Sequence, residues 1–200
     1  MEIRSFGENA APKLVAERTI EGHAVVFGQE SRVIFDKTTR RCFVEVIQPG
    51  AVTEEMLRGW DIKALCEHDK GRMLARSFKG VGSLSLNVDD YGVKYRFEAP
   101  NTHDGDYVVE MIKRGDMFGS SFAFLSDETK NVRYTRRSDG MLLRSVMKLD
   151  FMSDVSIVSD PAYMGTDVSV RSLESYFTPE NTDEAYVKQV LELRNLSINN

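Results

Sequence analysis

Short runs of alternating apolar and polar residues, each ended by a turn signal, constrain the fold of this chain more than any other feature. Such runs cover residues 19–27, 32–35, 42–47, 60–68, 93–98, 131–137 and 141–152. Asp89-Asp-Tyr-Gly92 and Ser138-Asp-Gly140 are typical of hairpin turns between strands. Eight or more strands against two short helices before residue 170 predict a mostly β fold, a barrel or sandwich with helices packed outside.

The two short helices have capping signals. The first is predicted over residues 51–58, with Thr53 as its N-cap and Gly59 as its end. The second has apolar residues at helical spacing between 107 and 112, Thr102 or Asp104 as its cap, and Gly115 as its stop. Each helix is expected to lie outside the strands.

The sequence pattern also divides the chain into three predicted parts. Residues 1–17 show little pattern and are expected to form a flexible N-terminal arm. Residues 18–170 contain the strands and form the core domain. Residues 171–200 are read as a linker over 171–177 and a helical tail that begins at Thr178-Pro-Glu180. The tail helix, near 178–196, either packs on the domain or docks to a partner.

Composition excludes several classes of protein. The 200 residues carry a net charge of -5, so there is no surplus of lysine and arginine to neutralise nucleic-acid phosphates. Cys42 and Cys66 are too few for a disulfide framework and are expected to be small core residues. No apolar run approaches the roughly 18 residues that span a bilayer, and the first residues lack a signal-peptide pattern. We therefore expect a soluble intracellular protein that binds neither nucleic acid nor membrane.

The segment Phe118-Gly-Ser-Ser-Phe-Ala-Phe-Leu125 is an unusual strand. Its phenylalanines share one face with Ser120, whereas Ser121 lies between Gly119 and Ala123 on the other face. Small neighbours leave room for a substrate to approach the Ser121 hydroxyl, as a nucleophile requires. The simpler interpretation is an ordinary strand serine whose small neighbours accommodate another element.

The chain offers three histidines as a general base for Ser121. His103 lies in a turn before a helix, and His23 lies at a glycine-flanked strand start, where an exposed or packed histidine is ordinary. His68 ends an apolar strand face beside a turn, where an imidazole can be half-buried. His68 is therefore the preferred candidate.

A serine nucleophile also needs an acid that orients the histidine. Asp154 is preferred because it shares a strand face with Ser156, and Asp150 and Glu67 are competitors; Asp154 could also be a surface acid at a strand start. A Cys66 nucleophile, or a metal site built from Cys42, Cys66 and His68, lacks the usual spacing. No glycine-rich phosphate loop follows a strand, so no nucleotide or other cofactor is expected.

Four segments, in this order, resemble the prohead proteases of tailed bacteriophages, which are related in fold to the herpesvirus assembly protease, assemblin. They are Ile47-Gln-Pro-Gly-Ala-Val52; Glu67-His-Asp69 with Gly71-Arg72; Arg114-Gly-Asp-Met-Phe-Gly-Ser-Ser-Phe-Ala-Phe124; and Asp154-Val-Ser-Ile-Val-Ser-Asp-Pro-Ala-Tyr163 with Thr166. The family's histidine matches His68, and its serine, which directly precedes phenylalanine, matches Ser121. Its acidic position is usually glutamate, whereas this chain has the shorter Asp154.

The resemblance implies a closed, assemblin-like β-barrel with peripheral helices and a serine endopeptidase that works in the host cytoplasm, inside the assembling prohead. Its expected substrates are the scaffold segment of the major capsid protein and the protease itself. Self-association into a homo-oligomer is left open, and no metal or cofactor is implied. The tail helix near 178–196 is then expected to dock the protease to the assembling shell and to be removed by self-cleavage. The alternative from another class is a non-catalytic module that binds capsid or scaffold protein.

Overall fold

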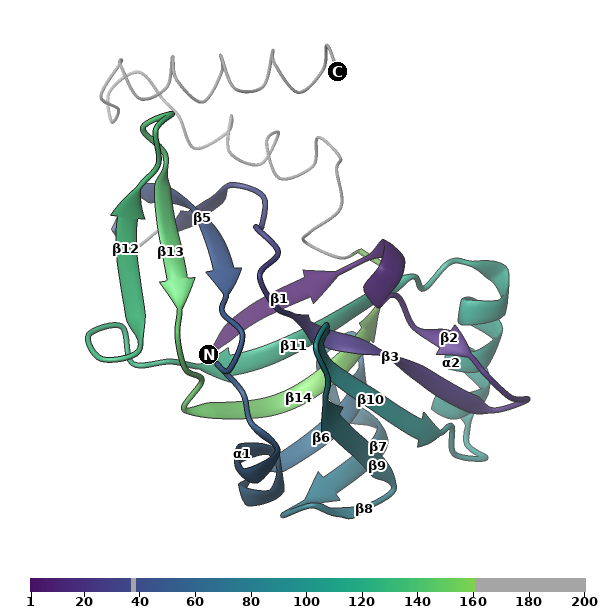
Figure 1. Ribbon diagram of the computed structural model, residues 1–200. Coiled ribbons are helices and arrows are strands. Elements are labelled where there is room, and N and C mark those ends of the chain that lie inside the picture. Colours follow the sequence, from purple (N-terminus) through teal and green to yellow (C-terminus); the bar gives the residue numbers. More distant parts are fainter. Residues whose placement is uncertain (37–38, 161–200) are drawn as a thin grey trace. The chain divides into compact units, whose positions relative to one another are not determined.

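The computed structural model describes residues 1–36 and 39–160, which lie in the first of two compact units, 1–164. These residues form fourteen strands and two α-helices, so the predicted mostly β fold is confirmed (Figure 1). A six-stranded sheet has the order β1-β11-β14-β6-β7-β8, and two four-stranded sheets have the orders β2-β3-β10-β9 and β12-β13-β5-β4. The strands are β1 (Glu2–Phe6), β2 (Lys13–Leu14), β3 (Thr19–Val26), β4 (Ile34–Asp36), β5 (Arg41–Ile47), β6 (Asp61–Cys66), β7 (Asp69–Phe78), β8 (Val81–Gly82), β9 (Leu84–Val88), β10 (Gly92–Glu98), β11 (Gly119–Leu125), β12 (Val132–Arg136), β13 (Leu142–Val146) and β14 (Phe151–Val158).

Within the described residues the backbone pairings give three open sheets and no ring of hydrogen-bonded strands. Closure into a barrel therefore stays a prediction. The linker and tail helix predicted over residues 171–200 lie outside the described residues. No helix among the described residues is long and apolar enough to cross a membrane.

Local signals position the helices and hairpins as expected. Helix α1 (Glu54–Gly59) begins where the Thr53 hydroxyl accepts a hydrogen bond from the backbone N–H of Met56. Helix α2 (His103–Arg114) has Thr102 as its N-cap and ends at Gly115, whose φ of 78° is left-handed. The turns at 89–92 and 138–140 join the antiparallel pairs β9–β10 and β12–β13, which confirms both predicted hairpins.

Three expectations about strands were wrong. Residues 2–6, assigned to a flexible arm, form β1 and pair with β11, a partner more than a hundred residues away that no local pattern indicates. The strand expected over 60–68 ends at Cys66, so His68 lies in the following turn and not on the strand face. The strand expected over 141–152 is interrupted: residues 142–146 form β13, whereas residues 151 and 152 begin β14, which belongs to a different sheet.

Aromatic packing fixes β11 in the core. Phe122 and Phe124 are fully buried, and their rings stack with centroids 5.0 Å apart. Phe6 of β1 stacks on Phe122 from the neighbouring strand, at 6.2 Å. The sheet that contains β3 lies against β1 and β11. The expected row of buried phenylalanines therefore holds the serine-bearing strand rigidly between β1 and β14.

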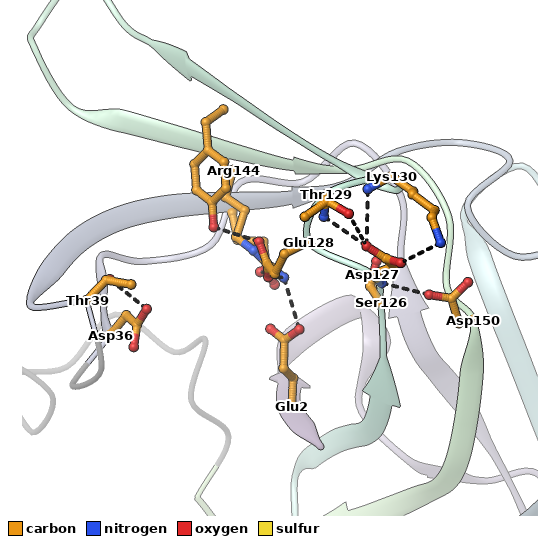
Figure 2. A network of polar contacts seen from close by, with 12 residues as sticks. Glu2, Asp36, Thr39, Ser126, Asp127, Glu128, Thr129, Lys130, Arg144 and Asp150 are labelled. Atoms are coloured by element: carbon orange, nitrogen blue, oxygen red, sulfur yellow. Dashed lines mark hydrogen bonds and ion pairs between the residues drawn. The ribbon is translucent and has the colours of Figure 1, made fainter.

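A buried ionic cluster ties β1 to the sheet that contains β5 and β13. Arg4 Nε donates to Glu45 Oε1 at 2.5 Å, and Arg144 also donates to Glu45, whose side chain is 0% exposed. Arg144 further contacts Glu2 and Glu128 (Figure 2). Burial alone would lower the pKa of Arg144, but these carboxylates outweigh burial and raise it. Removing one member of such a pair costs about 3–5 kcal/mol, because the remaining charge is left buried and unpaired.

Candidate active site

Ser121 lies on β11, between the two strands that flank it in the sheet. In the register, Ser121 is opposite Ser5 of β1 on one side and Ser156 of β14 on the other. Its side chain is 0% exposed. The expectation of open space above the hydroxyl was therefore wrong, because side chains and backbone of neighbouring elements occupy that space.

His68 is held by a strained two-residue turn. Glu67 and His68 connect β6 to β7, and both have left-handed backbone angles, with φ of 54° and 56°. Non-glycine residues in this region cost roughly 1–3 kcal/mol each and tend to occur at functional sites. The turn is fixed to the end of β14, because Glu67 N donates to Ile157 O at 3.0 Å and Ser159 N donates to Glu67 Oε1 at 2.8 Å.

Ser121, His68 and Asp154 form a continuous hydrogen-bonded chain across the sheet face. His68 Nε2 lies 2.6 Å from Ser121 Oγ, and His68 Nδ1 lies 2.6 Å from Asp154 Oδ1. A carboxylate only accepts, so Nδ1 carries a proton and donates it to Asp154. In neutral His68 the other nitrogen, Nε2, is then free to accept the Ser121 proton. The structure thus brings together the three residues that the sequence analysis preferred.

Two further serines hold the Asp154 carboxylate. Ser156 Oγ donates to Asp154 Oδ1 at 2.9 Å and lies 3.2 Å from His68 Nδ1, while Ser153 Oγ donates to Oδ2 at 2.7 Å. Burial would raise the pKa of Asp154, but the hydrogen bonds from His68 and from the two serines outweigh burial and lower it. From the sequence, Ser156 was predicted only to share a strand face with Asp154, and Ser153 was not selected. The available signal was sequence position, because Ser153 directly precedes Asp154 and Ser156 follows it by two residues.

Stability in acid is expected to depend on Asp154. Its folded-state pKa lies below the ordinary value of 3.8, so its contribution is fully present above that value and is lost as pH falls through the lower folded-state pKa. The free energy of unfolding, measured by urea titration, should fall more steeply below about pH 4 in the wild-type chain than in Asp154→Asn. Equal pH dependence in the two proteins would contradict this assignment.

The competing acids have other partners. Asp150 is exposed and accepts from Asp127 N at 2.6 Å and from Asn131 Nδ2 at 2.8 Å. Glu67 anchors the turn beside His68, as described above, and no contact between its carboxylate and the His68 ring is found among the described residues. Asp154 is therefore the acid that reaches the imidazole in this structure.

The other histidines and the cysteines lie in different settings. His23 Nε2 lies 2.8 Å from Asp89 Oδ2, and His103 is the first residue of α2. Cys42 and Cys66 are both buried, as expected. Burial raises the pKa of the Cys66 thiol to about 11, which disfavours the thiolate that a cysteine nucleophile requires.

This arrangement has the chemical components of acyl transfer. It contains, in this order, a hydroxyl, an imidazole that can accept the hydroxyl proton, and a carboxylate that fixes the imidazole tautomer. All three side chains come from strands of one sheet or the turn between two of its strands, so the geometry rests on a hydrogen-bonded framework. Precise placement on rigid elements is what such chemistry demands.

Comparison with known protein families gives a match over most of the chain. The model of the family described as caudovirus prohead serine protease matches residues 8–179 of the chain. No curated protein and no solved structure matches significantly. The matched residues include those that carry Ser121, His68 and Asp154.

Proposed function

The chain belongs to the caudovirus prohead serine protease family, and on this premise we propose that it is a serine endopeptidase with Ser121 as nucleophile, His68 as general base and Asp154 as orienting acid. Membership of this family implies a role in capsid maturation, with capsid proteins as substrates, inside the assembling prohead in the host cell. The observation that carries the residue assignment is the pair of 2.6 Å contacts that link the three side chains.

The proposed reaction follows from this hydrogen-bonded chain. Ser121 Oγ attacks the peptide carbonyl carbon while its proton passes to His68 Nε2, and Asp154 stabilises the resulting imidazolium without taking its proton. The C–N bond then breaks, and His68 gives the proton to the leaving amine. Water attacks the acyl carbon, His68 takes a proton from that water, and the proton returns to Ser121 as the acid product leaves.

Access to Ser121 sets a structural requirement. Near-attack geometry places the carbonyl carbon about 3–3.5 Å from the attacking oxygen. Because Ser121 is 0% exposed, neighbouring chain has to move before a peptide reaches its hydroxyl. Movements of loops or lids gate the active sites of many enzymes.

We further propose that the substrate is the scaffold segment of the major capsid protein, and that the chain also cleaves itself. The tail helix predicted near 178–196 is proposed to be removed by this self-cleavage. We also propose that the strands close into an assemblin-like barrel. Mixing the purified chain with capsid protein from the same phage should yield a shortened capsid protein and shortened protease by intact-mass measurement. If both proteins keep full length with both wild-type and Ser121→Ala chains, a non-catalytic assembly module is the better account.

A further inference from the structure

Strand β1 brings a second hydroxyl to the proposed nucleophile. It is an edge strand of the six-stranded sheet, and its register places Ser5 directly opposite Ser121 of β11. Ser5 Oγ donates to Ser121 Oγ at 2.8 Å, and the backbone carbonyl of Arg4 lies 2.9 Å from the same oxygen. Both residues lie in the segment predicted to be a flexible arm, and no local pattern in the sequence places them near Ser121.

The hydrogen-bond capacity of Ser121 defines what Ser5 does. A serine hydroxyl donates one hydrogen bond and accepts up to two. The Ser5 hydroxyl occupies an accepting position, so the Ser121 proton points away from Ser5. It is directed to an acceptor, which is either the Arg4 carbonyl or Nε2 of neutral His68 at 2.6 Å. Ser121 can transfer its proton and attack a carbonyl carbon only when that proton is directed to His68.

Ser5 is suited to this role because it is buried and fixed. It is 4% exposed, and Ser121 is the hydrogen-bond partner of its hydroxyl among the described residues. The preceding residue, Arg4, is held by Glu45 and through it by Arg144 of another sheet. A side chain on so constrained a backbone limits the rotamers open to its neighbour.

We propose that Ser5 is a positioning residue for Ser121, holding the Ser121 oxygen in the rotamer that faces His68 Nε2. This inference rests on the proposed function, since it concerns the same nucleophile. The hydroxyl of Ser5 forms no bond with the substrate in this account. Instead, Ser5 increases the fraction of time that Ser121 spends in the rotamer that faces His68 Nε2.

The test measures how fast an alkyl fluorophosphonate reacts with Ser121 in the full-length chain, so no knowledge of the natural substrate is needed. Ser5→Ala and Ser5→Val lack the hydroxyl, whereas Ser5→Thr retains it in the shape of valine. We expect alanine and valine to slow labelling about tenfold, the rate equivalent of one ordinary hydrogen bond, and threonine to stay within about threefold of wild type. Ser77→Ala, which removes another buried serine of the same sheet, should label at the wild-type rate.

Several results would overturn the inference. Wild-type labelling by Ser5→Ala, or equal rates for the threonine and valine variants, would show that the hydroxyl has no positioning role. Melting temperatures show whether a variant is labelled slowly because it unfolds. Ser5→Thr and Ser5→Val have nearly the same shape, so a difference between their labelling rates reflects the hydroxyl group. If wild type is labelled at Ser121 and Ser5→Ala is unchanged, only the role of Ser5 fails. If a wild-type chain that is cleaving capsid protein is not labelled at Ser121, the proposed function fails with it.

Discussion

Replacement of Ser121 by alanine is expected to lower the rate of peptide cleavage by about 10⁶-fold, with little change in the fold. The variant removes the oxygen that forms the acyl bond and leaves the Asp154–His68 pair intact. It also removes one acceptor from the buried Ser5 hydroxyl, so a small loss in the free energy of unfolding is expected. The measurement is the cleavage rate of capsid protein, with circular dichroism to monitor folding.

Ser120→Ala is the matched control for this prediction. Ser120 is the adjacent residue on β11 and is equally buried, but its hydroxyl contacts Ala10 O at 2.7 Å and Tyr95 Oη at 2.8 Å. Loss of these contacts should reduce stability and leave the cleavage mechanism in place. An inactive Ser120→Ala variant together with an active Ser121→Ala variant would show that Ser120, not Ser121, is the nucleophile.

Replacement of Asp154 by asparagine should lower kcat by about 10⁴-fold. An amide at this position can donate to Nδ1, which favours the tautomer with the proton on Nε2. That nitrogen then cannot accept the Ser121 proton, although the distances between the residues hardly change. The substitution is nearly isosteric, so the loss should fall on kcat and leave KM similar.

The control for the acid is Asp150→Asn. Asp150 was the competing candidate, and its carboxylate binds Asp127 N and Asn131 in an exposed loop. This variant should keep kcat within a few-fold of wild type. A loss of activity that is larger for Asp150→Asn than for Asp154→Asn would contradict the assignment of the orienting acid.

Features encoded within a few residues were predictable from the sequence. Thr53, Thr102 and Gly115 cap the helices as their residue types predict, and the turns at 89–92 and 138–140 lie where hairpin signals occur. These features depend on local backbone preference, which short patterns report directly. Alternation also placed the phenylalanines of β11 in the core.

The candidate site was selected by a combination of residue pattern and family resemblance, and its finer geometry was not predictable. β1 pairs with β11, while β6 and β5 pair in parallel with β14 and β13, and all these pairings join distant parts of the chain. Sequence patterns carry no register between distant strands. For this reason the strained turn at His68 and the contact between Ser5 and Ser121 emerged only from the structure.

The most direct test of the whole account is the identity of the residue that an alkyl fluorophosphonate modifies in a chain that is cleaving capsid protein. Peptide mapping with fragmentation distinguishes Ser121 from the adjacent Ser120. The account predicts one adduct on Ser121, loss of cleavage in proportion to its formation, and almost no adduct in His68→Ala. Loss of cleavage with the adduct on another residue, or full cleavage by a chain fully modified at Ser121, would contradict it.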